Sequence, residues 1–257
     1  MCLIAIAWQA RRDIPLLVAA NRDEWRERPA KAAHWWPERT DLLAGRDLQA
    51  GGTWMGITRG GRFAAVTNFR DPSDKRSTAR SRGNLVTEFL VGDETPARFL
   101  SNLSTRASDY NAFNLIVGDT ASLFYFGSRE GQPRAIEPGV HAISNHLLDE
   151  PWPKVVAATV AMNQALDDRD PMGVLFEMLS DSNQPEDEDL PHTGVGPEWE
   201  RRLGAALITG KDYGTRVSTV LAVTTIGEAI FEERTRAPDG EVTQTVRESF
   251  TVEAVTA

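Results

Sequence analysis

The sequence contains a single cysteine, Cys2, among its 257 residues. One thiol cannot form an intrachain disulfide, and nothing in the composition indicates an oxidising compartment. One thiol also cannot build a sulfur-rich metal site, and no group of histidines, cysteine and carboxylates has the spacing of metal ligands. We therefore expect no disulfide, no bound metal and no resident cofactor.

Long apolar runs and an excess of positive charge are also lacking. No apolar run approaches the ~18 residues that a membrane-spanning helix needs. The apolar start is followed by Arg11 and Arg12, whereas a secretory signal has its positive charges first. The net charge of -9 argues against general binding to nucleic acids or membrane surfaces. We predict a cytoplasmic protein with no membrane span and no nucleic-acid partner.

The remaining composition is that of a globular protein, with 41% hydrophobic and 25% charged residues. This length fits one large domain, so residues 1–257 are treated as a single unit. Strand patterns occupy residues 2–9, 14–21, 42–44, 53–58, 62–69, 113–117, 122–126, 134–136, 140–144, 215–225, 228–234 and 242–252. Helical patterns occupy residues 84–91, 96–107, 153–168 and 171–179, and residues 70–82 and 181–197 read as loops.

The order of these patterns limits the fold without deciding it. Strands dominate both ends of the chain, and two blocks of helices lie between them. Two sheets packed face to face with helices outside fit this order, as does a two-layer α+β fold. Within 153–168, one buried stripe is predicted, formed by Val155, Val156, Thr159, Val160, Asn163 and Leu166. A Pro-flanked stretch holding Trp25, Trp35 and Trp36 is interpreted as a loop.

Cys2 directly follows Met1, and this position suggests chemistry. Removal of Met1 would leave a free α-amine on the residue that carries the thiol. An α-amine has a pKa of about 7.7–8.0, so it can accept the thiol proton near neutral pH. One residue would then supply both nucleophile and base. On position alone, a small buried hydrophobe at a strand start is the commoner explanation of such a cysteine.

Polar residues close several apolar strands. Asn21-Arg22-Asp23-Glu24 ends the second strand, which a hairpin would place beside the first. Alternation puts Asn21 and Asp23 on one face and Arg22 on the other. An Asp close to an N-terminal amine would orient it. Similar strand ends are Thr67-Asn68, Ser144-Asn145-His146 and Gly214-Thr215-Arg216.

These strand ends offer suitable chemistry. Asn amides can donate to the oxygen that becomes negative during attack on a carbonyl. A fixed Arg can support a thiolate or hold a substrate anion. Taken singly, each is better explained as a turn-forming Asn or a surface Arg.

Five ordered motifs together resemble the NRDE family, also called the transport and Golgi organisation family. They are Asn21-Arg22-Asp23-Glu24, Gly51-Gly52-Thr53-Trp54-Met55-Gly56, Thr67-Asn68-Phe69-Arg70, Ser144-Asn145 and Gly214-Thr215-Arg216-Val217-Ser218. The likeness runs from Cys2 to about residue 225. A more distant likeness links the chain to choloylglycine hydrolase and penicillin V acylase, which are N-terminal-nucleophile hydrolases. This resemblance implies an α+β fold arranged as a four-layer αββα sandwich.

The acylase resemblance also implies a catalytic set. Cys2 would be nucleophile and base, and Asp23 the partner of its amine. Asn68 and Asn145 would be oxyanion-side donors, with Arg216 supporting the thiolate. The substrate-binding positions are then Asn21, Arg22, Trp25, Trp54, Arg70 and His146.

One departure from the acylase pattern concerns an arginine. The acylases usually carry an Arg three residues before the Asp, where this chain has Ala20. Arg22 is adjacent to the Asp instead, and alternation points it away. We expect it to fill the role only across a bulge.

Two functions of different classes follow. The protein would be a thiol-dependent hydrolase or acyltransferase that attacks an amide or thioester through an acyl–Cys2 intermediate. Alternatively, it would bind and deliver a small molecule, because the family resemblance implies links to haem trafficking and acyl-CoA handling. In either case the partner is a small acyl compound or haem, and the sequence carries no signal for an oligomeric state.

Each candidate ligand has its own residues. Haem ligands would come from Cys2, His34, His141, His146 and His192, although no Cys-x-x-Cys-His motif is present. For an acyl-CoA-like ligand, loop 70–82 carries five basic and two acidic residues, a charge of +3. We expect its Arg76, Arg80 and Arg82 to contact a phosphate, unless the loop is simply solvated.

Overall fold

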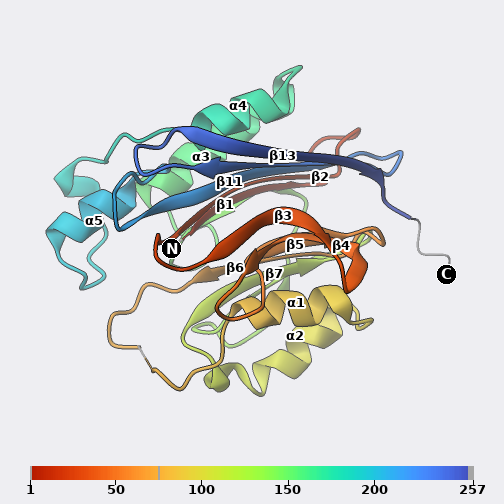
Figure 1. Cartoon of the computed structure of the whole chain (residues 1–257), viewed down its shortest axis with the longest axis horizontal. Helices are drawn as coiled ribbons and strands as arrows, with labels where there is room; N and C mark the ends of the chain where they lie inside the picture. The colour runs from red at the N-terminus through yellow and green to blue at the C-terminus, as the bar shows by residue number, and fades with distance from the viewer. Residues whose placement is uncertain (1, 75, 254–257) are drawn as a thin grey trace.

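Two antiparallel sheets packed face to face form the centre of the molecule, with helices on both outer surfaces (Figure 1). The structure is a computed structural model, and it describes residues 2–74 and 76–253. Met1 and Lys75 lie outside the described residues. The four-layer αββα sandwich predicted from the resemblance is confirmed.

The first sheet has six strands and carries Cys2. Its order is β10 (Gly139–Ile143), β1 (Cys2–Trp8), β2 (Leu16–Trp25), β11 (Tyr213–Val223), β12 (Glu228–Arg236) and β13 (Val242–Thr251). The second sheet has seven strands in sequence order. They are β3 (Ala30–Trp36), β4 (Arg39–Asp47), β5 (Met55–Thr58), β6 (Phe63–Asn68), β7 (Phe113–Gly118), β8 (Leu123–Gly127) and β9 (Arg134–Ala135).

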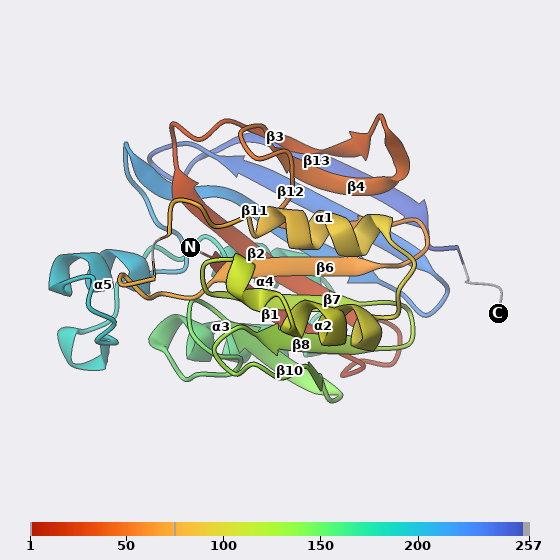
Figure 2. The same ribbon diagram turned by 90° about the horizontal axis from the view of Figure 1, so that it is seen from below.

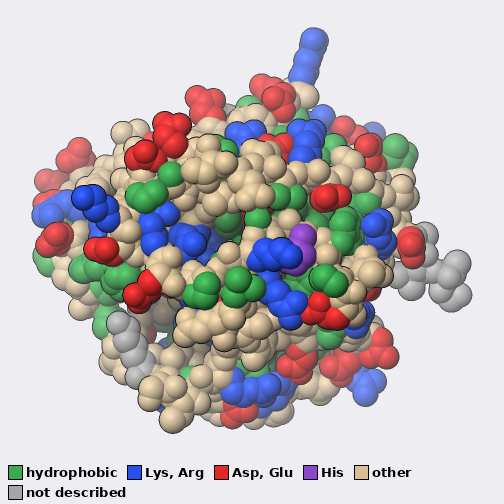
Figure 3. All heavy atoms as spheres, viewed as in Figure 1, with side chains coloured by type: hydrophobic (Ala, Val, Ile, Leu, Met, Phe, Trp, Pro, Cys, Tyr) green, Lys and Arg blue, Asp and Glu red, His purple; other side chains and the backbone are tan. Residues whose placement is uncertain are grey.

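Helices cover each sheet on its outer face, as two perpendicular views show (Figures 1 and 2). The first sheet is covered by α3 (Pro153–Asp167) and α4 (Pro171–Met178), and the second by α1 (Gly83–Val91) and α2 (Pro96–Ser104). The short α5 (Pro197–Gly204) lies at the end of the sandwich where β1 begins. None of the described helices is long and apolar enough to cross a membrane. Acidic and basic side chains are interspersed over the surface in Figure 3.

Strand alternation sorts the apolar side chains into separate layers of the core. In β1, Leu3 and Ala5 face α3 and α4, whereas Ile4 and Ile6 face the second sheet. Both faces of β1 are therefore buried, which explains its continuous apolar sequence. Each such fully buried Leu or Ile contributes about 1.5–3 kcal/mol to folding.

The predicted hairpin of β1 and β2 is confirmed, and glycines close two further tight turns. Gly61 and Gly240 have φ values of +77° and +94°, a conformation in which a side chain would be strained. Gly61 closes the turn between β5 and β6, and Gly240 closes that between β12 and β13.

Two predictions about elements need correction, and one helix was not predicted. Residues 30–36, interpreted as loop, form β3, and α5 covers residues 197–204, which begin where the predicted loop 181–197 ends. The predicted stripe on α3 is also wrong, because Val156 is 49% and Val160 52% exposed. The buried face of α3 instead consists of Lys154, Val155, Ala158, Met162 and Ala165. Small Ala side chains let α3 approach the sheet closely, so the β-branched residues can face solvent.

Candidate active site

Cys2 is held between two neighbouring strands at the start of β1. On one side it pairs with Arg22 of β2. On the other side the ladder with β10 runs to the pair Ile4–Ile143, and Ser144 follows directly. The Ser144 hydroxyl donates to the Cys2 carbonyl oxygen at 3.1 Å. The backbone that carries the thiol is therefore fixed from both sides.

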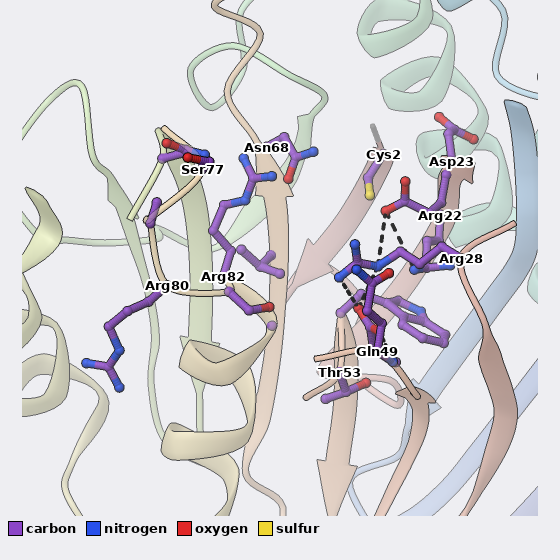
Figure 4. A pocket seen from close by; sticks show the side chains of 18 residues that line it. Cys2, Arg22, Asp23, Arg28, Gln49, Thr53, Asn68, Ser77, Arg80 and Arg82 are labelled. Atoms are coloured by element: carbon purple, nitrogen blue, oxygen red, sulfur yellow. Dashed lines mark hydrogen bonds and ion pairs between the residues drawn. The ribbon is translucent and has the colours of Figure 1, made fainter. Parts of the chain in front are cut away.

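The thiol opens into a cavity of about 370 Å³ with two facing walls (Figure 4). One wall comes from β1, β2 and the residues after β2. The opposite wall comes from the end of β6 and the segment before α1. The lining residues are Cys2, Arg22, Asp23, Glu24, Arg28, Asp47, Gln49, Thr53, Trp54, Val66, Asn68, Ser77, Ala79, Arg80, Ser81, Arg82, Gly83 and Asn111.

Asp23 lies next to the thiol, as the hairpin predicted. It is 1% exposed, and its Oδ1 accepts a hydrogen bond from the Thr215 hydroxyl at 2.7 Å. Burial raises the pKa of Asp23, while the positive charge of Lys154 and the Thr215 hydrogen bond act against this. The site therefore contains a buried carboxyl group whose ionisation depends on the cations around it.

The Cys2 thiol is not activated by its surroundings alone. Burial is the largest influence and raises the pKa of Cys2, and the Asp23 charge acts in the same direction. The Arg22 charge and the backbone N–H of Asp23 oppose the rise without cancelling it. The thiol consequently keeps its proton near neutral pH, so a base must remove that proton if Cys2 is to attack a carbonyl.

Arg22 faces the thiol, contrary to our expectation. Alternation does place Arg22 and Asp23 on opposite faces, but Cys2 shares the face of its register partner Arg22. No bulge interrupts this pairing between β1 and β2. Arg22 is 6% exposed and stacks on the Trp54 ring at 4.4 Å. Its Nη1 makes no hydrogen bond to any described residue.

A buried carboxyl group, Glu233 on β12, was not singled out from the sequence. It is 1% exposed and accepts the backbone N–H of Ala33 at 2.7 Å, which ties β12 to β3 of the other sheet. Burial raises the pKa of Glu233 to about 7, with Arg22 among the groups that oppose the rise. Arg22 therefore has two acidic groups of its own sheet nearby, Glu233 of β12 and Glu24 of β2, whose Oε2 lies 3.7 Å from Arg22 Nη2.

Arg216 does not join the cavity, which corrects its predicted role as a thiolate support. The β2–β11 register shifts between Thr215 and Val217, so Arg216 is the bulged residue. Its Nη1 donates to the carbonyl oxygens of Trp25, Arg26 and Arg28 at 3.0–3.2 Å. Arg216 thus fixes the turn after β2, and the arginines that line the cavity are Arg22, Arg28, Arg80 and Arg82.

The two candidate oxyanion donors lie together but differ in exposure. Asn68, at the end of β6, lines the cavity. Asn145 is 0% exposed, and its Nδ2 donates to the Asn68 carbonyl oxygen at 2.9 Å. In this arrangement Asn145 orients the Asn68 backbone, and Asn68 is the one that reaches the open space.

Of the predicted substrate-binding residues, only Arg22 and Trp54 line this cavity. The Asn21 amide donates to the carbonyl oxygens of Leu179 and Ala206, toward the helical layer. Trp25 is 46% exposed and lies edge-on to Trp199 and Tyr213. These two positions are therefore structural anchors of β2 rather than walls of the cavity.

Arg70 and His146 lie behind the Asn68 wall. Arg70 pairs with Glu200 of α5 at 2.5 Å, with both side chains less than 5% exposed. Its guanidinium lies 4.6 Å from the Trp152 ring, and the His146 ring is 5.5 Å from the same ring. Arg70 lines a separate space of about 160 Å³ that shares Asn68 and Arg82 with the main cavity.

Loop 70–82 splits into residues that face the cavity and residues that do not. Arg80 and Arg82 both line it, but the Arg82 side chain points toward Asn68 whereas that of Arg80 points away from Cys2 (Figure 4). Arg82 Nη1 donates to the Ala112 carbonyl oxygen at 3.1 Å, and neither arginine has a carboxylate within 4.0 Å among the described residues. Arg76 instead bonds the carbonyl oxygens of Ser108 and Tyr110. On the opposite wall, Arg28 pairs with Asp47 at 2.7 Å, so its charge is already balanced (Figure 4).

Behind the thiol, the space between the sheets is almost filled. A second space beside Cys2 has a volume of about 10 Å³ and is lined by Ile4, Ala20, Met55 and Val66, among others. That volume accommodates one water molecule at most. Any larger group must therefore approach Cys2 from the open cavity.

Metal ligands do not gather around the site. No cluster of three or more His, Cys, Asp or Glu side chains suited to a metal occurs among residues 2–74 and 76–253. Cys2 is the one proposed haem ligand that lines the cavity, and His141 bonds Asp149 at 2.8 Å instead. His34, His146 and His192 do not line the cavity either.

A profile of the family "Transport and Golgi organisation 2" matches residues 1–238. The chain belongs to this family. The mouse relative, "Transport and Golgi organization 2 homolog", is 33% identical over 256 residues and covers 91% of this chain and 92% of its own length. A bovine homologue is 35% identical with the same coverage. The resemblance read from the five motifs is confirmed.

The family's fold has a counterpart among solved structures. The C2A mutant of conjugated bile acid hydrolase from Clostridium perfringens aligns with a TM-score of 0.50, over 98% of this chain and 97% of that chain. The two sequences are 9% identical, so the likeness concerns the fold alone. It agrees with the N-terminal-nucleophile hydrolase architecture of the sandwich.

Proposed function

We propose that this family member is a thiol-dependent acyl-transfer enzyme in which Cys2 attacks an amide or thioester carbonyl. The observation that carries the proposal is the position of the sole thiol in a polar cavity that Asp23, the buried Arg22 and the partly buried Arg82 also line. A cysteine kept for packing alone would lie among aliphatic side chains. Location in the cytoplasm remains a prediction.

The proposed reaction needs a base, and the α-amine of Cys2 would be that base once Met1 is removed. Sγ attacks the carbonyl carbon while the thiol proton passes to the amine. The C–S bond forms, the C–N or thioester C–S bond breaks, and the leaving amine or thiol takes the proton. Water or an acceptor then attacks the carbonyl carbon of the acyl–Cys2 thioester and gives up a proton to the amine. The C–S bond breaks, the acid or acylated acceptor is released, and the proton passes from the amine to Sγ to restore the thiol. Asn68 and Arg82 face the carbonyl side, where they support the developing negative charge.

The test is intact-protein mass spectrometry, alone and after treatment with an activated acyl ester. We expect the mass without Met1 and a single acyl adduct. The adduct should be absent in Cys2→Ala, since no other cysteine is present. Retained Met1 with no adduct would remove the support for the enzyme.

A second candidate, a carrier for an anionic small molecule, is favoured by the Arg80–Arg82 wall. Arg80 and Arg82, which have no carboxylate within 4.0 Å in the part of the chain that the structure describes, fit a phosphate or another multiply charged group. Acyl-coenzyme A combines such a group with a thioester, so it suits either the carrier or the enzyme. Haem fits less well, because Cys2 lines the cavity but none of the histidines proposed as haem ligands does.

Neutralising this wall gives a separate prediction. Each Arg→Gln change at 80 or 82 should weaken binding of an acyl-coenzyme A about tenfold, because a charge-assisted hydrogen bond contributes about 1.5 kcal/mol or more. Isothermal titration calorimetry at two salt concentrations measures the affinity of each variant for the acyl-coenzyme A. Arg76→Gln is the matched control, since Arg76 lies in the same loop but does not line the cavity. Equal losses in all three variants would contradict a site at Arg80 and Arg82.

A further inference from the structure

Lys154 occupies a position where a lysine costs stability in two ways. The residue is 4% exposed, and its Nζ has no hydrogen-bond partner among residues 2–74 and 76–253. It also lies in the first turn of α3, where the helix dipole disfavours positive charge. A buried ammonium group without hydrogen bonds is destabilising. Neither packing nor helix stability explains a lysine here.

The surroundings of Lys154 point to the Cys2 site. α3 packs on β1, and the neighbouring Val155 belongs to the same core cluster as Leu3. Burial raises the pKa of Asp23, and among the charges that oppose this rise Lys154 is the strongest. Burial lowers the pKa of Lys154 itself to about 8, and the Asp23 charge partly offsets the fall.

Further charged and titratable groups lie around Lys154 and Asp23. Arg70 disfavours the charged form of Lys154, whereas the Cys2 thiolate favours it. Arg70 is balanced by its ion pair with Glu200, and Tyr213 faces Asp23 and Cys2 from β11. Lys154 is therefore the cation of the helical layer whose charge stabilises the ionised form of Asp23.

We infer that Lys154 is a positioning residue that keeps the α-amine of Cys2 in its neutral, proton-accepting form. The inference rests on the proposed function, because that amine exists only after Met1 is removed. β2 continues past Arg22, the partner of Cys2, so Asp23 lies beside the point where β1 begins. Asp23 is then shared between the amine and Lys154. The ammonium group of Lys154 makes a second positive charge on the amine unfavourable.

The charge of Lys154 should lower the pKa of the Cys2 α-amine. An unperturbed α-amine has a pKa of about 7.7–8.0, so most of it is protonated at pH 7. A nearby positive charge lowers that pKa and increases the neutral fraction. Removing the charge of Lys154 should therefore raise the amine pKa by about one pH unit, the size of effect that a neighbouring like charge produces.

The single cysteine makes this measurable without any turnover. Protein labelled with [15N]cysteine gives one nitrogen resonance, that of Cys2, and its shift titrates with the amine. We expect Lys154→Met to raise the amine pKa by about one pH unit. Lys154→Arg, which keeps the charge, should restore the wild-type value. The matched control is Lys211→Met, which neutralises an exposed lysine and should leave the pKa unchanged.

The Cys2 amine titration distinguishes failure of the proposed base from failure of the Lys154 role. An amide-type resonance means that Met1 is retained, and it overturns the proposed base and the inference together. An amine whose pKa is the same in wild type and Lys154→Met overturns the role of Lys154 alone. A merely structural lysine would change the melting temperature without moving this titration.

A second measurement avoids any dependence on the folding of Lys154→Met. Wild-type protein labelled at lysine Nζ has four lysine resonances, and Lys154→Arg identifies which one is Lys154. Two coupled groups titrate with mutually dependent curves. Independent single-step curves for Lys154 and the Cys2 amine would overturn the inference.

Discussion

Asp23→Asn should slow acylation of Cys2 about 10²-fold or more, the usual size of a lost acid–base contribution. Asn preserves the shape of the side chain and can still accept from the Thr215 hydroxyl, whose bond to Asp23 Oδ1 is 2.7 Å long. What Asn removes is the negative charge that would hold the amine of Cys2 in place. It also leaves Lys154 facing a neutral group.

Single-turnover adduct formation, followed by intact mass spectrometry between pH 6 and 9, measures this loss. Asp47→Asn is the matched control, because Asp47 lines the same cavity but pairs with Arg28. Both variants need a melting curve that shows a folded protein. Equal adduct rates in Asp23→Asn and wild type would remove Asp23 from the mechanism.

Glu200→Gln should lower the free energy of unfolding by about 3–5 kcal/mol, the cost of breaking a buried ion pair on one side. Glu200 Oε2 lies 2.5 Å from Arg70 Nη1, and its Oε1 accepts from Thr193 at 2.7 Å. Gln fills the same space but leaves Arg70 as an uncompensated buried cation. Arg70 already has Nε and Nη2 without partners among the described residues.

The control for this prediction lies in the same helix. Arg201 of α5 pairs with Asp187 at 2.5 Å, but those side chains are 41% and 65% exposed. Arg201→Gln should therefore cost at most about 1 kcal/mol. Urea denaturation at constant slope measures both values. Similar midpoint shifts for Glu200→Gln and Arg201→Gln would show that burial of the pair has little effect.

The sequence predicted the part of the site that depends on strand pairing. β1 and β2 are continuous apolar runs, which identify a buried hairpin, and a hairpin necessarily brings Asp23 close to Cys2. Asn68 likewise ends a strand whose length the apolar pattern defined. Arg22 was misplaced because its direction was judged relative to Asp23, whereas the register pairs it with Cys2.

Residues that depend on irregular backbone could not be placed in this way. Arg216 is a bulged residue, and a bulge turns a side chain out of the alternating pattern. β3 has two register shifts against β4, which hide its strand periodicity. The direction of Arg80 and Arg82 depends on a loop with no periodicity at all.

Lys154 was missed for a different physical reason. Lysine is seldom buried, so a search for an apolar stripe excludes it by rule. The true stripe of α3 consists largely of alanines and a methionine, which give a weaker signal than the valines on the exposed face. The best sequence signal would have been a lysine in the first turn of a helix, where positive charge is unfavourable.

The filled space behind Cys2 determines the route of every ligand. With room for one water molecule at most on that side, a ligand can reach and leave Cys2 only through the open cavity. In the proposed reaction, the leaving group and the incoming water or acceptor would therefore approach the acylated sulfur from the same side.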